Sequence, residues 1–234
     1  ERGTTWDVYV MTTDCFRNCA LVCVDIQEGQ RGPNITSQTM PRLWKSMGFT
    51  AEDVNAASAY AWEVCLPNAV RVVQASRRAG FPLIFIHWGF RFADGMDLDP
   101  EIYETMRTNH GTDPAQWPGH IDQPGSRPAA VLDVQPGEYV LAKSGQDAFT
   151  SSNLDFVLRN LGVACLVFVG GHTGACLGKT AQSAKTRGYA AVCIEDATSD
   201  ARESTRRTHI REVGFDAVMT TAEYLARLDA AMDP

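Results

Sequence analysis

The sequence predicts an α/β fold in which helices cover both faces of an open, doubly wound sheet of parallel strands. Two observations lead to this prediction. Short apolar runs rich in Val, Ile and Leu recur along the chain, and segments with helical periodicity lie between them. Runs that are apolar on both faces are typical of a parallel sheet, because helices bury each side of it. Alternation of strands and helices favours the doubly wound arrangement.

Six apolar runs are the expected strands, and five periodic segments are the expected helices. The strands cover residues 20–26, 82–87, 139–141, 164–169 and 190–194, with a weaker one at 216–219. The helices cover residues 67–79, 153–160, 176–187, 202–213 and 221–231. Pro67 begins the first helix and Gly80 follows it, as helix termini prefer. Ser151 and Ser152 offer capping hydroxyls to the second helix, and Gly162 follows it.

Two stretches, residues 28–61 and 89–135, follow neither pattern, and the second is rich in Pro, Gly, Asp and His. We expect long irregular loops there, of the kind that often form lids or subunit contacts. The sequence contains no repeat, low-complexity tract or linker, so residues 1–234 are expected to form a single domain.

Charge and composition narrow the class of partner. The chain has 234 residues and a net charge of −7. Nucleic acids and anionic membranes attract clustered Lys and Arg, so this acidic balance argues against both and favours a small-molecule ligand. The sequence has no run of about 20 apolar residues, and its start lacks the pattern of a signal peptide. We expect a cytoplasmic protein whose seven cysteines are reduced thiols, because an odd, scattered set does not suit a disulfide framework.

Polar residues at the ends of three expected strands are candidates for a reactive site. In an open α/β sheet, ligands bind outside the carboxyl ends of the strands. Asp25 lies near the end of the first strand, Lys143 follows the third, and Cys176 follows the fourth after a glycine-rich turn. Taken singly, Asp25 is as well explained by a structural role, and Lys143 by exposure to solvent.

Cys176 has the most informative position, since a helix is expected to begin there. In the first turn of a helix, a thiol meets the positive end of the helix dipole and free N–H groups, which favour the thiolate. The same N–H groups can stabilise an oxyanion on a substrate. Cys23, Cys165 and Cys193 lie inside apolar strands and are interpreted as inert core residues.

Other types of site fit the sequence less well. The spacing of Cys15, Cys19 and Cys23 departs from zinc and iron–sulfur spacings, so no metal is predicted. The run VFVGGHTGACLGKT resembles a phosphate-binding loop, but that motif needs glycine where Thr173 stands. No G-x-G-x-x-G motif follows a strand, so no dinucleotide cofactor is expected. A nucleotide-binding protein and a non-catalytic small-molecule-binding protein stay open as alternatives.

Four motifs stand in order along most of the chain. They are D-x-Q at Asp25, Ile26 and Gln27; Lys143 followed by Ala148 and Phe149; G-x-x-T-x-x-C at Gly170, Thr173 and Cys176; and T-A-x-x-A-x-x-x-G-Y at residues 180–189, with Asp196 and Ala197 after the next strand. Together they resemble the isochorismatase-like cysteine hydrolase superfamily, which includes nicotinamidases, N-carbamoylsarcosine amidases, ureidoacrylate amidohydrolases and biuret hydrolases.

The resemblance implies a Rossmann-like three-layer sandwich with a mostly parallel six-stranded sheet, and a catalytic triad of Asp25, Lys143 and Cys176. It also implies a cis peptide between Gly171 and His172, which turns the His172 N–H toward the oxyanion, beside the N–H of Cys176. Isochorismatases proper, which cleave a vinyl ether, lack the cysteine, so Cys176 implies cleavage of a C–N bond. The nicotinamidase metal residues are missing from HWGFRFADGMDLDP, and neither a metal nor an organic cofactor is expected. Homodimers or homotetramers are usual in the family.

The resulting hypothesis is a cysteine-dependent amidohydrolase that releases ammonia or an amine from a small amide, ureide or carbamoyl amine. Asp25 takes the proton of Cys176 while Lys143 holds the carboxylate, and the thiolate attacks the carbonyl to form a thioester that water hydrolyses. Substrate contacts are expected from four further residues: Gln27, His87, Arg91 and Phe149. For Gln27, a hydrogen bond at the strand end is the alternative role.

Overall fold

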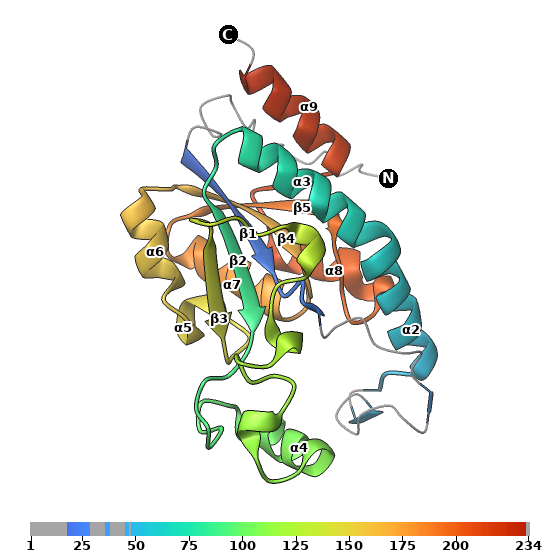
Figure 1. Ribbon diagram of the computed structural model, residues 1–234. Helices are drawn as coiled ribbons and strands as arrows, with labels where there is room; N and C mark the ends of the chain where they lie inside the picture. Colours follow the sequence, from blue (N-terminus) through green and yellow to red (C-terminus); the bar gives the residue numbers. More distant parts are fainter. Residues whose placement is uncertain (1–17, 29–35, 38–44, 47, 233–234) are drawn as a thin grey trace.

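The computed structural model describes residues 18–28, 36–37, 45–46 and 48–232, and it contains a six-stranded sheet with helices on both faces (Figure 1). The strand order is β3-β2-β1-β4-β5-β6, and every neighbouring pair is parallel. The strands are β1 (Cys19–Val24), β2 (Leu83–Trp88), β3 (Tyr139–Lys143), β4 (Cys165–Gly170), β5 (Ala190–Thr198) and β6 (Ala217–Met219). The chain winds outward from the centre in both directions, which confirms the predicted α/β sandwich.

The two central strands, β1 and β4, are buried along their whole length. Most of their side chains are aliphatic or cysteine, which suits strands that helices cover on both faces. The observed strands differ from the expected runs by one to a few residues. The largest difference is at β5, which extends to Thr198 although the apolar run ends at residue 194.

The helices of the described residues lie between the strands and after the last one. They are α2 (Ala51–Tyr60), α3 (Leu66–Arg78), α4 (Pro100–His110), α5 (Ala148–Ser151), α6 (Leu154–Leu161), α7 (Cys176–Thr186), α8 (Glu203–Val213) and α9 (Thr221–Met232), with a π-helical turn η3 (Ala61–Cys65) and 3₁₀ turns η4 (Pro114–Gln116), η5 (Pro124–Ser126) and η6 (Ala130–Leu132). None of these helices is long and apolar enough to span a bilayer.

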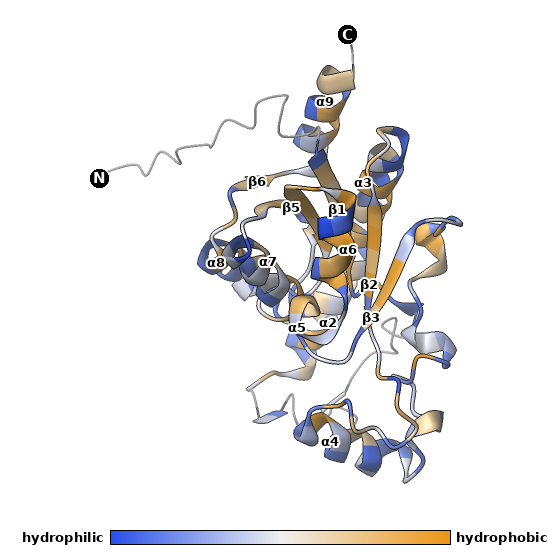
Figure 2. Cartoon of the chain, turned by 90° about the vertical axis from the view of Figure 1, so that its left-hand side faces the viewer, coloured by the Kyte–Doolittle hydropathy of each residue, from blue (hydrophilic) through white to orange (hydrophobic). Residues whose placement is uncertain are grey.

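Each face of the sheet has its own core. α3 and α9 pack on one face, where Val72, Val73 and Leu228 are buried against the sheet. α6 and α7 pack on the other, with Leu158 and Leu177 among the buried residues. Figure 2 shows the hydrophobic residues gathered in the strands between these layers. Burying one such side chain contributes about 1.5–3 kcal/mol, so the two cores hold the sheet rigid under the strand ends.

Two helices lie in the stretches expected to be irregular, so that expectation is wrong for residues 51–60 and 100–110. α2 begins after Thr50, which forms a reciprocal capping box with Asp53. α4 begins with Pro100 at its first turn, after the Asp99 cap. Periodicity did not reveal α4 because none of its residues is buried. Most of residues 29–47 lies outside the described residues.

The first predicted helix is the second half of a longer one. α2 continues into α3 through η3, where the Leu66 N–H bonds to the carbonyl of Ala61, five residues back. Pro67, expected to begin a helix, is instead the second residue of α3, which begins directly after this π-helical turn. Such turns are rare and often occur at functional sites.

A candidate active site at the switch point of the sheet

The neighbouring strands β1 and β4 lie where the strand order reverses, and ligands of open α/β sheets bind at this point. Asp25 directly follows β1. The turn after β4 leads into α7, whose first residue is Cys176, and Lys143 is the last residue of β3. The three predicted catalytic residues therefore stand at the carboxyl ends of three strands of one parallel sheet.

Asp25 leaves β1 with a left-handed backbone conformation, at φ 51°. Among residues with a side chain, Asn and Asp adopt this conformation most readily. The Asp25 N–H donates to the carbonyl of Ile86 at 2.8 Å, which ties this turn to β2. The carboxylate is 7% exposed and reaches past the end of β2 to Lys143.

Lys143 is wholly buried, so the surface alternative for this residue is wrong. Its Nζ donates to Asp25 Oδ2 at 2.8 Å and to the carbonyl of Gly145 at 3.3 Å. Burial by itself would lower the pKa of Lys143, but the negative charges of Asp25 and of an ionised Cys176 raise that pKa above its ordinary value. Lys143 is therefore an ammonium at neutral pH.

The Cys176 thiol completes the group, since it lies close enough to Asp25 and Lys143 for both side chains to shift its pKa. Burial and the Asp25 charge raise the pKa of this thiol to about 12, although Lys143 acts in the opposite direction. The free site thus holds a neutral thiol beside a carboxylate, whereas the helix position alone predicts a thiolate. A thiol that keeps its proton next to a base is suited to transfer that proton when a substrate arrives.

Two glycines that flank the turn between β4 and Cys176, one at the end of β4 and one in the first turn of α7, are packed too closely for side chains. Gly170 has φ 107°, and a Cβ there would overlap the carbonyl of Val24. A Cβ at Gly178 would overlap the carbonyl of Thr173. These close approaches hold the turn against the end of β1, and so against Asp25.

Within this turn, the peptide between Gly171 and His172 is cis, as the resemblance implies. The His172 carbonyl accepts the N–H groups of Ala175 and Leu177, at 3.0 and 3.1 Å. By contrast, the N–H groups of His172 and Cys176 donate to no acceptor among the described residues. N–H groups in the first turn of a helix have no partner within the helix, which makes them available to an anion.

Two of the predicted substrate residues, Gln27 and His87, differ in whether their side chains already have hydrogen-bond partners. The Gln27 amide donates to the carbonyls of Trp88 and Ser126, at 2.9 and 3.0 Å, and accepts the Trp88 N–H at 2.9 Å. These bonds favour the structural alternative for Gln27. His87 is 8% exposed, and its Nδ1 has no hydrogen-bond partner among the described residues. The same is true of Asp25 Oδ1.

The other two predicted substrate residues, Arg91 and Phe149, make contacts with the protein itself. Arg91 donates to the Ala142 carbonyl at 3.1 Å, which leaves its guanidinium at the end of β3. Phe149 is buried in the core, with its ring 5.9 Å from that of Tyr189 and 4.9 Å from the guanidinium carbon of Arg187. Arg187 follows the far end of α7, about 16 Å from Cys176 at 1.5 Å per residue. The Phe149 ring is therefore a core side chain, and its position does not support a substrate contact.

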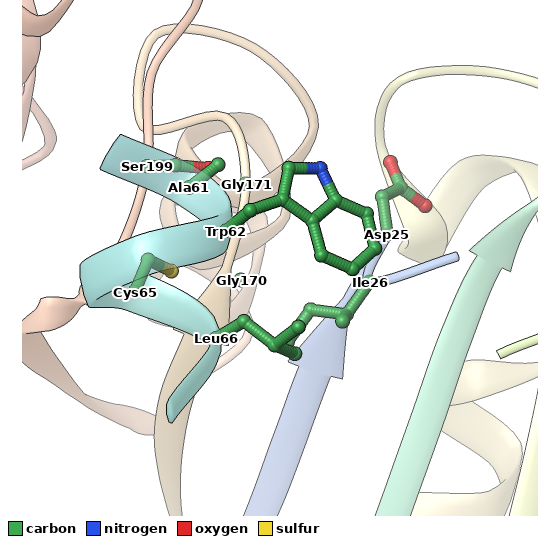
Figure 3. A pocket seen from close by; sticks show the side chains of 9 residues that line it. All are labelled: Asp25, Ile26, Ala61, Trp62, Cys65, Leu66, Gly170, Gly171 and Ser199. Atoms are coloured by element: carbon green, nitrogen blue, oxygen red, sulfur yellow. The ribbon is translucent and has the colours of Figure 1, made fainter. Parts of the chain in front are cut away.

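Trp62 lies beside the triad although the sequence analysis did not select it. It belongs to η3, and its indole points from that helical turn toward Asp25 (Figure 3). With Leu66 and Gly171 it borders a pocket of about 30 Å³, room for about one water molecule. The only available signal was an aromatic residue in a stretch with no clear period, and that signal does not indicate a site.

Two alternative sites can be compared with the part of the chain that the structure describes. Among the described residues, no cluster of three His, Cys, Asp or Glu side chains could hold a metal ion. Cys15, part of the cysteine spacing considered above, lies outside these residues. For the phosphate-loop alternative, α7 would have to begin near Lys179, yet it begins at Cys176 and leaves Lys179 exposed a turn further along.

Comparison with known proteins adds to this geometry. The model of the isochorismatase domain family matches residues 19–223. An isochorismatase family protein of Bacillus subtilis is 30% identical over 168 residues, which cover 70% of this chain and 82% of that protein. The ureidoacrylate amidohydrolase RutB of Rhizobium rhizogenes is 28% identical over 145 residues, covering 57% of this chain and 56% of RutB. In fold, the chain is similar to a cysteine hydrolase of Pseudomonas syringae, with a TM-score of 0.68, 19% identity and coverage of 92% and 94%.

Proposed function

Because this chain belongs to the isochorismatase family of hydrolases, we propose that it is a cysteine-dependent amidohydrolase acting on a small amide, ureide or carbamoyl amine. It breaks a C–N bond through a thioester on Cys176 and releases ammonia or an amine. The similarity to RutB, an amidohydrolase of a ureide, supports this type of substrate. Within the chain, the single observation that carries the proposal is the buried contact of Asp25 with Lys143 beside the Cys176 thiol.

In the first half of the reaction, Asp25 takes the proton of Cys176 as the thiolate attacks the substrate carbonyl. Lys143 holds the Asp25 carboxylate by a hydrogen bond before the transfer, and its positive charge stabilises the new thiolate. The carbonyl oxygen becomes an oxyanion and accepts hydrogen bonds from the N–H groups of His172 and Cys176. One such donor is worth about 3 kcal/mol of transition-state stabilisation.

The tetrahedral adduct then collapses as Asp25 returns its proton to the leaving nitrogen. The C–N bond breaks, ammonia or an amine departs, and the acyl group stays on Cys176 as a thioester. In the second half, Asp25 takes a proton from water, the resulting nucleophile attacks the thioester, and the thiol leaves with that proton. The acid product departs and the site returns to its starting state, without any redox change.

The surroundings of the triad suit a small substrate. The space next to Asp25 is narrow and is walled by the Trp62 indole and by Leu66. His87 Nδ1 and Asp25 Oδ1 are buried polar atoms that find no partner among the described residues, and such atoms are normally satisfied by a ligand or a water. A compact molecule with a carbonyl and N–H groups offers the hydrogen bonds that these atoms and the two free N–H groups require.

The test is ammonia release from a panel of small amides, ureides and carbamoyl amines. The parent protein is expected to turn over at least one member, and Cys176→Ala and Cys176→Ser are expected to lose at least about 1,000-fold in kcat. Cys193→Ala is the matched control, because Cys193 is a buried thiol inside β5 and the variant should keep its activity. The proposal is wrong if the parent releases nothing from any member, or if the Cys176 variants remain active.

A further inference from the structure

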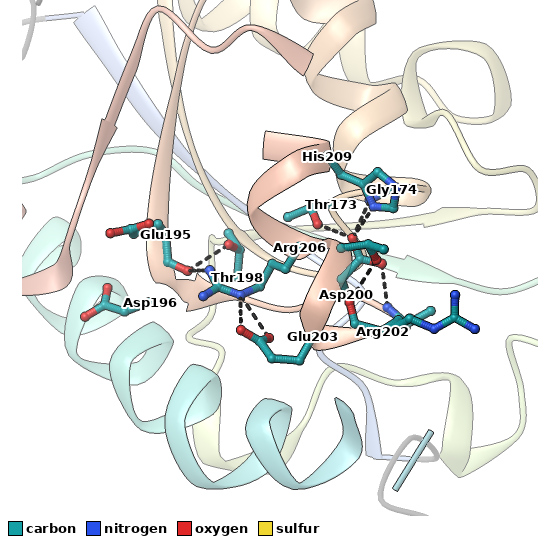
Figure 4. A network of polar contacts seen from close by, with 12 residues as sticks. Thr173, Gly174, Glu195, Asp196, Thr198, Asp200, Arg202, Glu203, Arg206 and His209 are labelled. Carbon is teal, nitrogen blue, oxygen red and sulfur yellow. Dashed lines mark hydrogen bonds and ion pairs between the residues drawn. The ribbon is translucent and has the colours of Figure 1, made fainter. Parts of the chain in front are cut away.

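Asp200, two residues after the end of β5, is hydrogen-bonded to the turn at residues 173–174, which precedes Cys176 (Figure 4). It is 4% exposed. Its Oδ2 accepts the Thr173 hydroxyl, the Gly174 N–H at 3.1 Å and His209 Nδ1 at 2.6 Å. Its Oδ1 accepts the Ala201 N–H at 2.6 Å. Four hydrogen bonds to one carboxylate fix it in place.

The backbone beside Asp200 holds the same turn from a second direction. The Ser199 N–H donates to the carbonyl of Gly170 at 2.8 Å, and the Ser199 carbonyl accepts the Thr173 N–H at 2.9 Å. Residues 199–200 therefore bind both ends of the segment 170–174. The cis peptide and the His172 N–H lie inside the segment that these bonds enclose.

His209 joins this arrangement from another element, since it lies in the middle of α8. A carboxylate offers acceptor oxygens, so His209 bonds to Asp200 in the tautomer that carries the ring hydrogen on Nδ1. The imidazole also covers Gly174, where an added Cβ would overlap the ring. His209 thus fixes Asp200 on one side and closes over the turn on the other.

The position of this turn matters to the proposed reaction because it carries both candidate oxyanion donors. Thr173 and Gly174 lie in the chain between His172 and Cys176, whose N–H groups are the two candidate oxyanion donors. A displacement of about 1 Å in such groups can lower a rate by about 100-fold. Charge-assisted bonds to a buried carboxylate are stronger than bonds between neutral groups, and they resist such displacement.

We propose that Asp200 and His209 are positioning residues of the active site, which hold the turn at residues 170–176 so that both N–H groups face the developing oxyanion. Neither residue touches the substrate. The inference rests on the proposed function for its effect on catalysis. It concerns the transition state more than substrate binding, because the oxyanion donors act most strongly once charge has formed on the oxygen.

The experiment compares His209→Ala with His209→Asn in steady-state kinetics on the best substrate of the panel. The Asn amide can donate from nearly the position of Nδ1, so this variant retains the bond to Asp200. We expect His209→Ala to lower kcat by about 10- to 100-fold with KM changed by less than about threefold. His209→Asn is expected to recover kcat to within about threefold of the parent. Glu212→Ala, an exposed position on the same helix, controls for substitution in α8.

A purely structural role would give a different result. Loss of folded protein would lower the amount of active enzyme in His209→Ala and His209→Asn alike, and intrinsic kcat would stay constant when rates are divided by the folded fraction. The inference is overturned if corrected kcat in His209→Ala stays within about twofold of the parent, or if His209→Asn is as slow as His209→Ala.

Hydrogen exchange of the backbone supplies a readout that does not need turnover. We expect His209→Ala to speed exchange in a peptide covering residues 170–178 and to leave β1 and β4 unchanged. If the parent has no activity on any substrate, the proposed function fails, and exchange then decides whether the two residues hold the turn. Unchanged exchange at residues 170–178 overturns the inference in either case.

Discussion

Lys143 Nζ lies 2.8 Å from Asp25 Oδ2, although β2 separates the strands that carry these residues. Both side chains are buried, so each charge has lost most of its hydration. The free-energy cost of removing two ions from water offsets most of the favourable energy of their attraction. A buried ion pair is therefore weak evidence for a stabilising role. Its position against the Cys176 thiol is better explained by control of proton transfer.

The first prediction concerns the free energy of unfolding of variants in this pair. Asp25→Asn and Lys143→Met each leave one buried charge unpaired, and each is expected to lower the free energy of unfolding by about 3–5 kcal/mol. Asn is chosen because it tolerates the positive φ of residue 25. The double variant should lose less than the sum of the two single losses, because neither charge remains, while activity stays absent. Urea unfolding and ammonia release measure the two properties.

The pair Glu104–Arg107, exposed on α4, is the control for this cycle. Arg107→Met should leave the urea midpoint almost unchanged, since solvent screens charges at that position. Additive losses in the double variant at the Asp25–Lys143 pair would contradict the prediction, as would restored activity.

A second prediction concerns the state of the Cys176 thiol in the free enzyme. Because the pKa of this thiol is raised to about 12, little thiolate exists at neutral pH. Alkylation of Cys176 by iodoacetamide should therefore rise about tenfold per pH unit from about pH 7 to about pH 10, without a plateau. Peptide mass mapping separates Cys176 from the other thiols.

Two variants test the causes of this pKa separately. Lys143→Met removes the charge that lowers the pKa and should slow alkylation, whereas Asp25→Asn removes a charge that raises it and should speed alkylation while turnover is lost. The protein unfolded in urea is the reference, because its thiols have an ordinary pKa near about 8.5 and their rate levels off above it. A plateau below about pH 8 in the folded parent would mean that the resting group is a thiolate.

The sequence allows the common location of the three candidate residues to be predicted, because each stands at or just beyond the carboxyl end of an apolar run. In a parallel sheet that position alone brings Asp25, Lys143 and Cys176 to one edge. Asp200 and His209 could not be found in the same way. Asp200 follows β5, whose last residues are mostly polar, so the apolar run does not show where the strand ends. His209 is one polar residue among many in α8. Only the packing of α8 over the nucleophile turn brings them together.

The third prediction concerns the effect of three buried thiols on the free energy of unfolding at alkaline pH. Burial raises the pKa of Cys65, Cys176 and Cys193 to about 12 each, whereas the unfolded chain releases these protons at ordinary pKa values. Below the unfolded pKa this difference has no effect on stability. Above that pKa, the thiols lose their protons in the unfolded state but keep them in the folded state. The free energy of unfolding therefore falls by at most about 1.4 kcal/mol per pH unit for each thiol.

Urea unfolding under reducing conditions, from about pH 8 to about pH 10, should show this loss. The window ends near the ordinary pKa of lysine, below the raised pKa of Lys143, whose own contribution is lost only at higher pH. Cys193→Ala removes one of the thiols, so the free energy of unfolding should fall less steeply with pH, by the contribution of one thiol. Equal slopes in the parent and in this variant would show that the Cys193 thiol does not contribute.

The fourth prediction concerns Trp62 and the size of the acyl group that the site accepts. The indole, carried by the π-helical turn, points toward Asp25 and leaves a space of only about 30 Å³. The extra residue of η3 changes the direction of this side chain relative to the buried face of α3, so the π-helical turn sets which residue faces Asp25. Replacing the indole by a methyl group enlarges the space next to Asp25.

Trp62→Ala is therefore expected to lower kcat/KM about tenfold for the smallest amide that the parent accepts, and to raise it for amides with a bulkier acyl group. The smallest substrate loses contact with the ring and with it the ordered position of its carbonyl, whereas the larger one fills the vacated space. Trp62→Phe keeps a ring at this position and should show a smaller change in preference. An unchanged ratio of kcat/KM between small and bulky amides in Trp62→Ala would mean that the acyl group binds on another side of Asp25.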